Sequence, residues 1–72
     1  MNNLNVAKIQ LNGDPYEING RTNLNELLNK LKIQKNKVAV EVNGEIVQKD
    51  KYKNLFLRKD DKVEIVHFIG GG

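Results

Sequence analysis

Three consecutive glycines, Gly70, Gly71 and Gly72, end the sequence and are the residues best suited to a chemical role. Glycine has no side chain, so these residues predict a thin and flexible thread rather than a packed element. The α-carboxylate at the end of such a thread is ionised at neutral pH and nucleophilic. Fully extended, three residues carry this group roughly 10 Å beyond the last strand. We therefore divide the chain into one domain, residues 1–69, and a flexible glycine tail, residues 70–72.

Other residue types that support chemistry are scarce and do not form a catalytic pattern. The chain has no cysteine and one histidine, which excludes disulfides, thiolate nucleophiles and multi-histidine metal sites. We interpret Asp60 and Asp61 as turn formers, because neighbouring carboxylates in a turn point in different directions. His67 could donate a proton near the tail, but we favour a structural role as a partly buried aromatic residue. The sequence therefore predicts no catalytic site, no bound metal and no bound cofactor.

Length and composition limit the remaining classes of function. The 72 residues predict one small domain with a marginal core, so its stability must come from packing. The net charge of +3 and the pI of about 9.3 would suit nucleic acid. However, the lysines are interleaved with acidic residues and aromatic residues are few, which argues against that class. No apolar run approaches the roughly 20 residues of a membrane span, and no signal peptide opens the chain. We expect a cytoplasmic protein that binds neither nucleic acid nor membrane.

The first part of the sequence predicts a β-hairpin. Residues 5–11 alternate apolar and polar side chains from Ala7 onward, which is the period of a half-buried strand. Asn12 and Gly13 follow directly and are the strongest short signal for a hairpin turn. Residues 16–18 then predict the returning strand.

A short amphipathic helix is predicted at residues 24–32. Its apolar side chains recur at i, i+3, i+4 and i+7 and form one continuous stripe: Leu24, Leu27, Leu28 and Leu31. Asn23 suits the N-cap position, and Glu26 three residues later could complete a capping box. We expect the leucine stripe to cover one face of a sheet.

Another pair of strands is predicted after the helix. Residues 38–42 alternate strictly, so their valines are expected to face the core. Asn43 and Gly44 predict a second tight turn, and residues 46–47 begin a short strand.

A less regular stretch and one long strand complete the domain. Leu55 and Leu57 predict a short strand, which Tyr52 and Phe56 are expected to cover in part. Residues 62–69 predict the last and longest strand, and the glycines begin where this strand stops.

The order of these elements predicts the fold class. A helix between two groups of strands, in so short a chain, crosses one face of a single mixed sheet. The right-handed crossover rule places the final strand, or the strand after the helix, next to the first strand. The sequence therefore predicts an α+β protein with the β-grasp arrangement, in which a mixed sheet of about four to five strands carries one main helix on one face.

The last predicted strand carries a candidate docking patch. Val66 and Phe68 share the face opposite to the core-facing positions of that strand. Because the helix can cover only one face of the sheet, we expect Val66, Phe68 and the adjoining Ile69 to be exposed and to contact a partner. The alternative is that the loop around residues 51–52 folds over them.

The chain resembles the ThiS family, the small ubiquitin-like sulfur carriers of thiamine thiazole biosynthesis, over essentially its full length. Four stretches carry the resemblance in the family's order, with the glycines at the end: residues 23–28, 38–47, 60–65 and 68–72. Singly these stretches are weak signals, and together they are fairly specific.

The resemblance implies a role for the glycine tail. In that family an ATP-using enzyme related to ubiquitin activators adenylates the terminal carboxylate, which is then converted to a thiocarboxylate. Gly72 would carry the reactive group, Gly71 would be its required neighbour, and Gly70 would lengthen the thread. The implied partners are a ThiF-like adenylyltransferase, a ThiG-like thiazole synthase and a cysteine-derived sulfur donor protein. The chain would be a co-substrate and not an enzyme, with ATP used by the activating partner.

Three other functions remain open at this point. A MoaD-like carrier for molybdopterin synthesis shares the fold and the glycine end, although such carriers tend to have a proline before the tail and residues 66–69 have none. In a ubiquitin-like modifier, Gly72 would be linked to a target lysine. In a β-grasp module that binds RNA or protein, the tail would be irrelevant.

Overall fold

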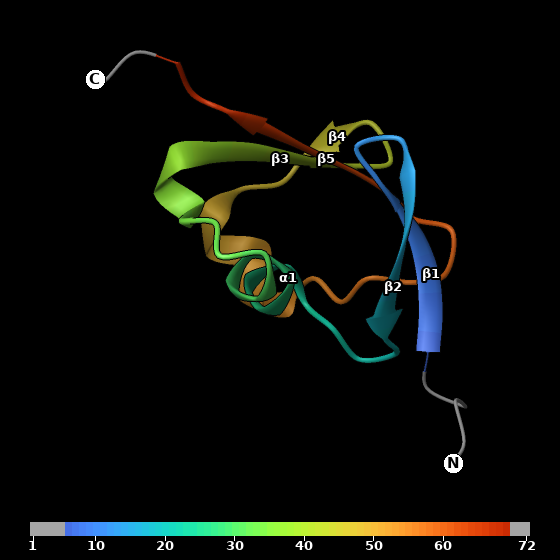
Figure 1. Ribbon diagram of the computed structural model, residues 1–72. Coiled ribbons are helices and arrows are strands. Elements are labelled where there is room, and N and C mark those ends of the chain that lie inside the picture. The colour runs from blue at the N-terminus through green and yellow to red at the C-terminus, as the bar shows by residue number, and fades with distance from the viewer. Residues whose placement is uncertain (1–5, 70–72) are drawn as a thin grey trace.

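The computed structural model describes residues 6–69 as one sheet with a helical layer on one face (Figure 1). The sheet has five strands in the order β2-β1-β5-β3-β4. Figure 1 shows the helix α1 (Leu24–Lys30) on one side of the sheet, with the 3-10 helix η2 (Lys49–Asn54) beside it. Residues 1–5 and the predicted tail, residues 70–72, lie outside the described residues.

The predicted hairpin is confirmed. Strands β1 (Val6–Leu11) and β2 (Asp14–Asn19) pair antiparallel along their full length. Asn12 has a φ of 49° and Gly13 a φ of 89°, which are the positive values that a two-residue hairpin turn requires at both positions. Strand β2 is longer than predicted and includes Pro15, which is tolerated there because β2 is an edge strand.

Helix α1 (Leu24–Lys30) begins as predicted. The Glu26 amide donates to Asn23 Oδ1 at 2.8 Å, and the Asn23 amide donates to Glu26 Oε1 at 3.0 Å, so the capping box is complete. The helix ends two residues earlier than the predicted boundary of 32. The Ile33 amide donates back to the Leu28 carbonyl at 2.9 Å, and Lys32 has a φ of 60°. This is a Schellman ending, in which a left-handed residue turns the chain and Ile33 folds back under the helix.

The second half of the chain supplies three strands and two 3-10 helices. In chain order these are η1 (Lys35–Lys37), β3 (Val38–Val42), β4 (Glu45–Ile46), η2 (Lys49–Asn54) and β5 (Lys62–His67). Strand β5 pairs parallel with β1 and antiparallel with β3. The last strand therefore lies beside the first, as the crossover rule predicted.

The predicted short strand at Leu55 and Leu57 is wrong. The Leu57 amide donates to the Thr22 carbonyl at 2.8 Å, and the Leu24 amide donates to the Leu55 carbonyl at 3.1 Å. These bonds tie the segment to the residues that enter α1 instead of to the sheet. Apolar alternation could not distinguish the two arrangements, because both bury every second side chain.

The core lies between the inner face of the sheet and the layer of α1 and η2. Its buried side chains are Ile9, Ile18, Leu24, Leu27, Leu28, Val38, Val40, Tyr52, Leu57, Val63 and Ile65. The prediction that Tyr52 and Phe56 partly cover a strand is therefore wrong for Tyr52, which is 0% exposed. Phe56 is 42% exposed, and the Arg21 guanidinium lies 4.9 Å from the centre of its ring.

The hydroxyl of Tyr52 is buried without a hydrogen-bond partner in the part of the chain that the structure describes. An unpaired buried hydroxyl costs free energy, because it has lost its hydrogen bonds to water. Burial also raises the pKa of the Tyr52 phenol above its ordinary value of 10.0, because the charged phenolate is poorly solvated there.

Replacement of Tyr52 by phenylalanine is expected to leave the unfolding free energy unchanged or to raise it by up to about 1 kcal/mol. Since the folded pKa of Tyr52 lies above the unfolded one, this residue lowers stability only as the pH rises from about 10 through the folded pKa. Urea unfolding near pH 8 and near pH 11 measures both effects. The Tyr52→Phe variant should lose less stability between these pH values than the wild type, and a larger loss would contradict the assignment.

Candidate functional site

Strand β5 leads the chain out of the domain toward the glycines. It ends at His67 rather than at the predicted residue 69, and it pairs with β3 from Val63 to His67. One further bond follows, in which the Phe68 amide donates to the Lys37 carbonyl at 2.9 Å. Ile69 is the last described residue and is 98% exposed. The candidate reactive residues, Gly70 to Gly72, lie outside the described part of the chain.

The candidate docking patch, Val66, Phe68 and Ile69, is exposed. Val66 is 56% and Phe68 58% accessible to solvent, whereas the alternate positions of β5 are buried. The alternative that the loop around residues 51–52 covers the patch is wrong, because Tyr52 lies in the core on the other face of the sheet. Exposed apolar side chains gathered in this way are typical of interaction surfaces, and a docking role for them stays a prediction.

One lysine from the helical layer contacts the base of the tail. The Lys49 ammonium group lies 5.6 Å from the centre of the Phe68 ring and donates to the Val38 carbonyl at 3.3 Å. This arrangement combines a cation–π contact with a hydrogen bond to the first residue of β3. Sequence reasoning missed Lys49, because no local pattern links it to a residue 19 positions away in another element.

The sheet face opposite α1, hereafter the outer face, continues the patch onto β3 and β4. Ala39 lies opposite Val66, and Ile46 lies opposite Glu41, in the antiparallel register. Directly opposed residues point to the same face, so the exposed Ile46 belongs to the outer face as well. Glu64, which precedes Val66 on this face of β5, lies opposite Glu41.

His67 is exposed, so its interpretation as a partly buried aromatic residue is wrong. It lies opposite Val38 at the end of β5, on the same face of the strand as the buried Ile65. The core ends before this position, which leaves the imidazole in solvent beside the departing chain.

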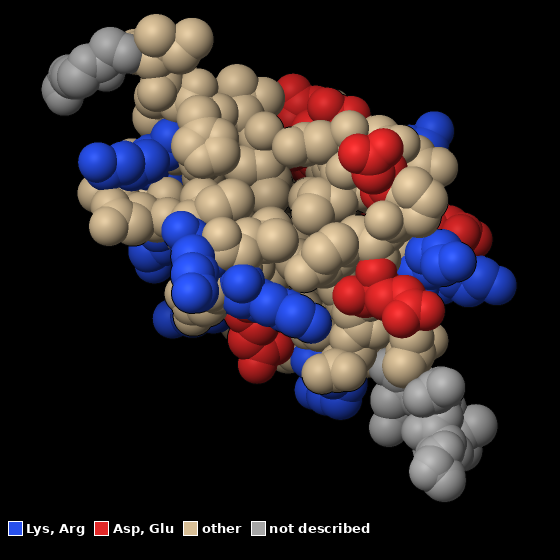
Figure 2. Space-filling view, in the orientation of Figure 1, with Lys and Arg blue, Asp and Glu red and all other residues tan. Residues whose placement is uncertain are grey.

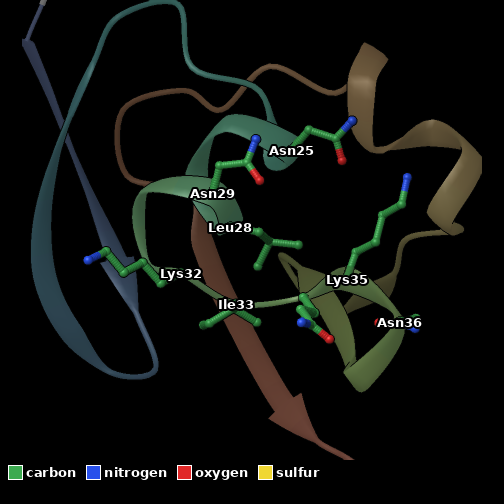
Figure 3. Close-up of a pocket in the computed structure, with 8 residues that line it drawn as sticks. Asn25, Leu28, Asn29, Lys32, Ile33, Lys35 and Asn36 are labelled. Atoms are coloured by element: carbon green, nitrogen blue, oxygen red, sulfur yellow. The ribbon is translucent and has the colours of Figure 1, made fainter.

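A cleft lies on the helical side of the molecule, next to the end of α1 (Figure 3). Its volume is about 730 Å³, and its lining combines amides and ammonium groups with two apolar side chains: Asn25, Leu28, Asn29, Lys32, Ile33, Gln34, Lys35 and Asn36. This lining has no carboxylate, hydroxyl, thiol or imidazole, and its ionisable groups are the ammonium groups of Lys32 and Lys35.

Residues 6–69 contain no cluster of three or more histidine, cysteine or acidic side chains placed to hold a metal ion. Within the same range, no helix is long and apolar enough to cross a membrane.

Comparison with known proteins decides the family. A model of the ThiS family matches residues 9–72, a span that includes the three glycines. The chain belongs to the ThiS family. The crystal structure of the thiamine biosynthesis protein ThiS from Geobacter metallireducens has a TM-score of 0.77 and 35% identity, over 90% of this chain and 99% of that chain. This match confirms the β-grasp fold that the order of elements predicted.

Three curated relatives show two different chain organisations. The sulfur carrier protein ThiS of Bacillus subtilis is 38% identical over 65 residues, which is 89% of this chain and 98% of that protein. A thiazole synthase of Magnetococcus marinus is 46% identical over 65 residues, which is 90% of this chain and 20% of the synthase. A second thiazole synthase, from Paramagnetospirillum magneticum, is also matched over 20% of its length. This ThiS-family chain therefore spans about one fifth of the thiazole synthases that it matches.

Proposed function

We propose that this chain is the sulfur carrier of thiazole formation in thiamine biosynthesis, and that the carboxylate of Gly72 carries the sulfur. The ThiS-family match, which extends through residue 72, is the observation that carries this proposal. The β-grasp domain supports it, because β5 directs the chain toward the glycines with Phe68 and Ile69 at the surface.

The proposed chemistry has two steps, both performed in the active site of a partner. The carboxylate oxygen attacks the α-phosphorus of ATP, which forms an acyl-adenylate and releases pyrophosphate. In the second step, the outer sulfur of a cysteine persulfide on the donor protein attacks the acyl carbon, and AMP leaves. A thiol then attacks the donor's sulfur atom in the resulting acyl disulfide, which releases the thiocarboxylate and leaves a disulfide between that thiol and the donor cysteine. Activation is needed because a carboxylate has no good leaving group, and a covalent intermediate divides one difficult step into two easier ones.

The proposed partners follow from this chemistry and from the relatives. A ThiF-like adenylyltransferase would supply ATP and the active site, so the carrier acts as a co-substrate without catalytic residues of its own. A ThiG-like thiazole synthase would receive the sulfur. The two thiazole synthases that contain a segment similar to this chain support that assignment, because they join a ThiS-like segment and a synthase in one polypeptide.

The direct test is the mass of the intact protein after incubation with ATP, a ThiF-like adenylyltransferase and a sulfur source. Exchange of one oxygen for sulfur is expected to raise the mass by about 16 Da. A reaction without ATP is the control and should leave the mass unchanged. If a ThiF-like enzyme that charges another ThiS protein leaves this chain unmodified, the proposed function is wrong.

A charged substitution in the docking patch should weaken binding to the adenylyltransferase. Phe68→Asp removes an exposed aromatic side chain and places a charge at the base of the tail, so the Kd is expected to rise about thirtyfold. Val6→Asp is the matched control, because Val6 is also exposed on the outer face, at the opposite end of the sheet and roughly 26 Å from Val66. Equal affinities of the two variants in a titration would exclude the patch from the interface.

A further inference from the structure

The outer face of the sheet carries two directly opposed charge pairs of opposite character. Lys8 of β1 lies opposite Glu17 of β2, so one pair joins unlike charges. Glu41 of β3 lies opposite Glu64 of β5, so the other pair joins like charges. Directly opposed residues of antiparallel strands have Cβ atoms about 4.5–5.5 Å apart, and like charges at this separation destabilise the pairing.

The acidic pair has no compensating hydrogen bond within residues 6–69. The side-chain hydrogen bonds of this part of the chain reach neither carboxylate. Its cross-strand and same-face neighbours on β3, β4 and β5 are largely apolar: Ala39, Ile46 and Val66. One cation stands near the pair: Lys62 lies two residues before Glu64 on the same face of β5. Its backbone bonds with Asn43 continue the β3–β5 ladder, so Lys62 is a diagonal neighbour of Glu41. None of the side-chain hydrogen bonds in residues 6–69 joins the Lys62 ammonium group to either carboxylate. The free domain thus holds two adjacent negative charges beside exposed apolar side chains.

The acidic pair lies on a molecule whose overall charge is positive. The chain has a net charge of +3, from 12 basic and 9 acidic residues. In Figure 2 most blue side chains gather at the lower left, over α1 and the 3-10 helices of Figure 1, and most red groups lie along the top and the right. The strand register, with Glu64 two residues before Val66 on the same face, places the acidic pair beside the docking patch, although the protein as a whole is basic.

We propose that Glu41 and Glu64 form the acidic part of the docking surface and together receive one basic side chain, an arginine or a lysine, of the adenylyltransferase. This inference depends on the proposed function for the identity of the partner. A guanidinium group placed between two carboxylates removes their mutual repulsion and makes charge-assisted hydrogen bonds to both. The repulsion in the free domain is thereby relieved on binding, which adds to affinity, and the charges select partners whose apolar pocket is bordered by a cation.

Under this proposal, removal of the Glu64 charge raises the stability of the free domain but lowers its affinity for the partner. A purely structural role of Glu64 would not change the two quantities in opposite directions. Glu64→Gln removes the repulsion, so the Tm of the free domain is expected to rise by roughly 1–6 °C. The same change should raise the Kd for a ThiF-like adenylyltransferase roughly fivefold at low salt and should flatten the dependence of the Kd on salt. Glu64→Lys places a cation opposite Glu41, so it should raise both the Tm and the Kd more than Glu64→Gln does.

The matched control is Glu17→Gln, which alters a glutamate on the same face whose partner is a lysine. Its Tm is expected to stay the same or to fall, and its Kd is expected to stay within about twofold of the wild type. A lower Tm for Glu64→Gln, or an unchanged Kd for both Glu64 variants, would overturn the proposal. In either case a wild-type chain that still gains about 16 Da would leave the sulfur-carrier function standing. A wild-type chain that gains no mass would overturn the proposed function itself.

Discussion

Deletion of Gly71 and Gly72 is expected to abolish formation of the thiocarboxylate, with a loss of at least about 100-fold in the rate of mass gain. The deletion shortens the thread by roughly 7 Å, which withdraws the carboxylate from the α-phosphate of ATP in the partner's active site. Displacement of a reacting group by as little as about 1 Å can cost a factor of 100, so this displacement should prevent the reaction. Intact mass spectrometry and ATP–pyrophosphate exchange measure the two steps separately.

Length and bulk can be separated with a second variant of the tail. Gly71→Val keeps the length of the thread but adds a branched side chain, which a narrow channel built around glycine would exclude. Both variants keep Val66 and Phe68, so their Kd for the adenylyltransferase should stay within about threefold of the wild type. A truncated protein that is still charged with sulfur at the wild-type rate would contradict the assignment of the tail.

Replacement of Leu27 by alanine is expected to remove a large part of the protein's unfolding free energy. Leu27 is fully buried in the stripe of α1 that covers the sheet. A Leu→Ala change at such a site costs about 2.7–5 kcal/mol, because it removes apolar contacts and leaves a cavity. A domain of this size has roughly 4–11 kcal/mol of stability in total, so the change removes much of it. Urea unfolding followed by circular dichroism measures the loss.

The matched control for Leu27→Ala is Leu31→Ala in the same leucine stripe. Leu31 is the C-cap residue of α1 and is only partly buried, so its truncation should cost about half as much or less. Equal losses for the two variants would contradict the depth of burial that distinguishes them.

The boundaries of α1 show how far local rules extend. The first turn was predictable, since Asn23 and Glu26 stand three residues apart and their capping bonds involve only neighbouring residues. The last turn was predicted two residues too long, because Leu31 continues the apolar stripe although Lys32 adopts a left-handed backbone. A non-glycine residue in that conformation leaves no signal in a hydrophobic pattern.

The candidate site likewise has some features that the sequence predicted and others that it did not. The exposure of Val66 and Phe68 followed from the alternation of β5 together with the presence of a single main helix. The contact of Lys49 with Phe68 and the opposition of Glu41 and Glu64 did not follow, because each depends on how separate elements are placed. Cross-strand contacts in general cannot be predicted from one strand alone, since a shift of the register by one residue changes every cross-strand partner.

The amino-acid sequence by itself determined the hairpin, the helix, the outward side of the last strand and the glycine end, and its resemblance to the ThiS family indicated the function. These features depend on periodicity, turn chemistry and composition within a few residues, which are written directly in the chain. Only the tertiary structure decided that Tyr52 lies in the core, that residues 55–57 attach to the start of the helix, and that two glutamates oppose each other beside the docking patch. Those outcomes depend on contacts between residues far apart in sequence, where several packings satisfy the same local pattern and the geometry of the whole domain selects one.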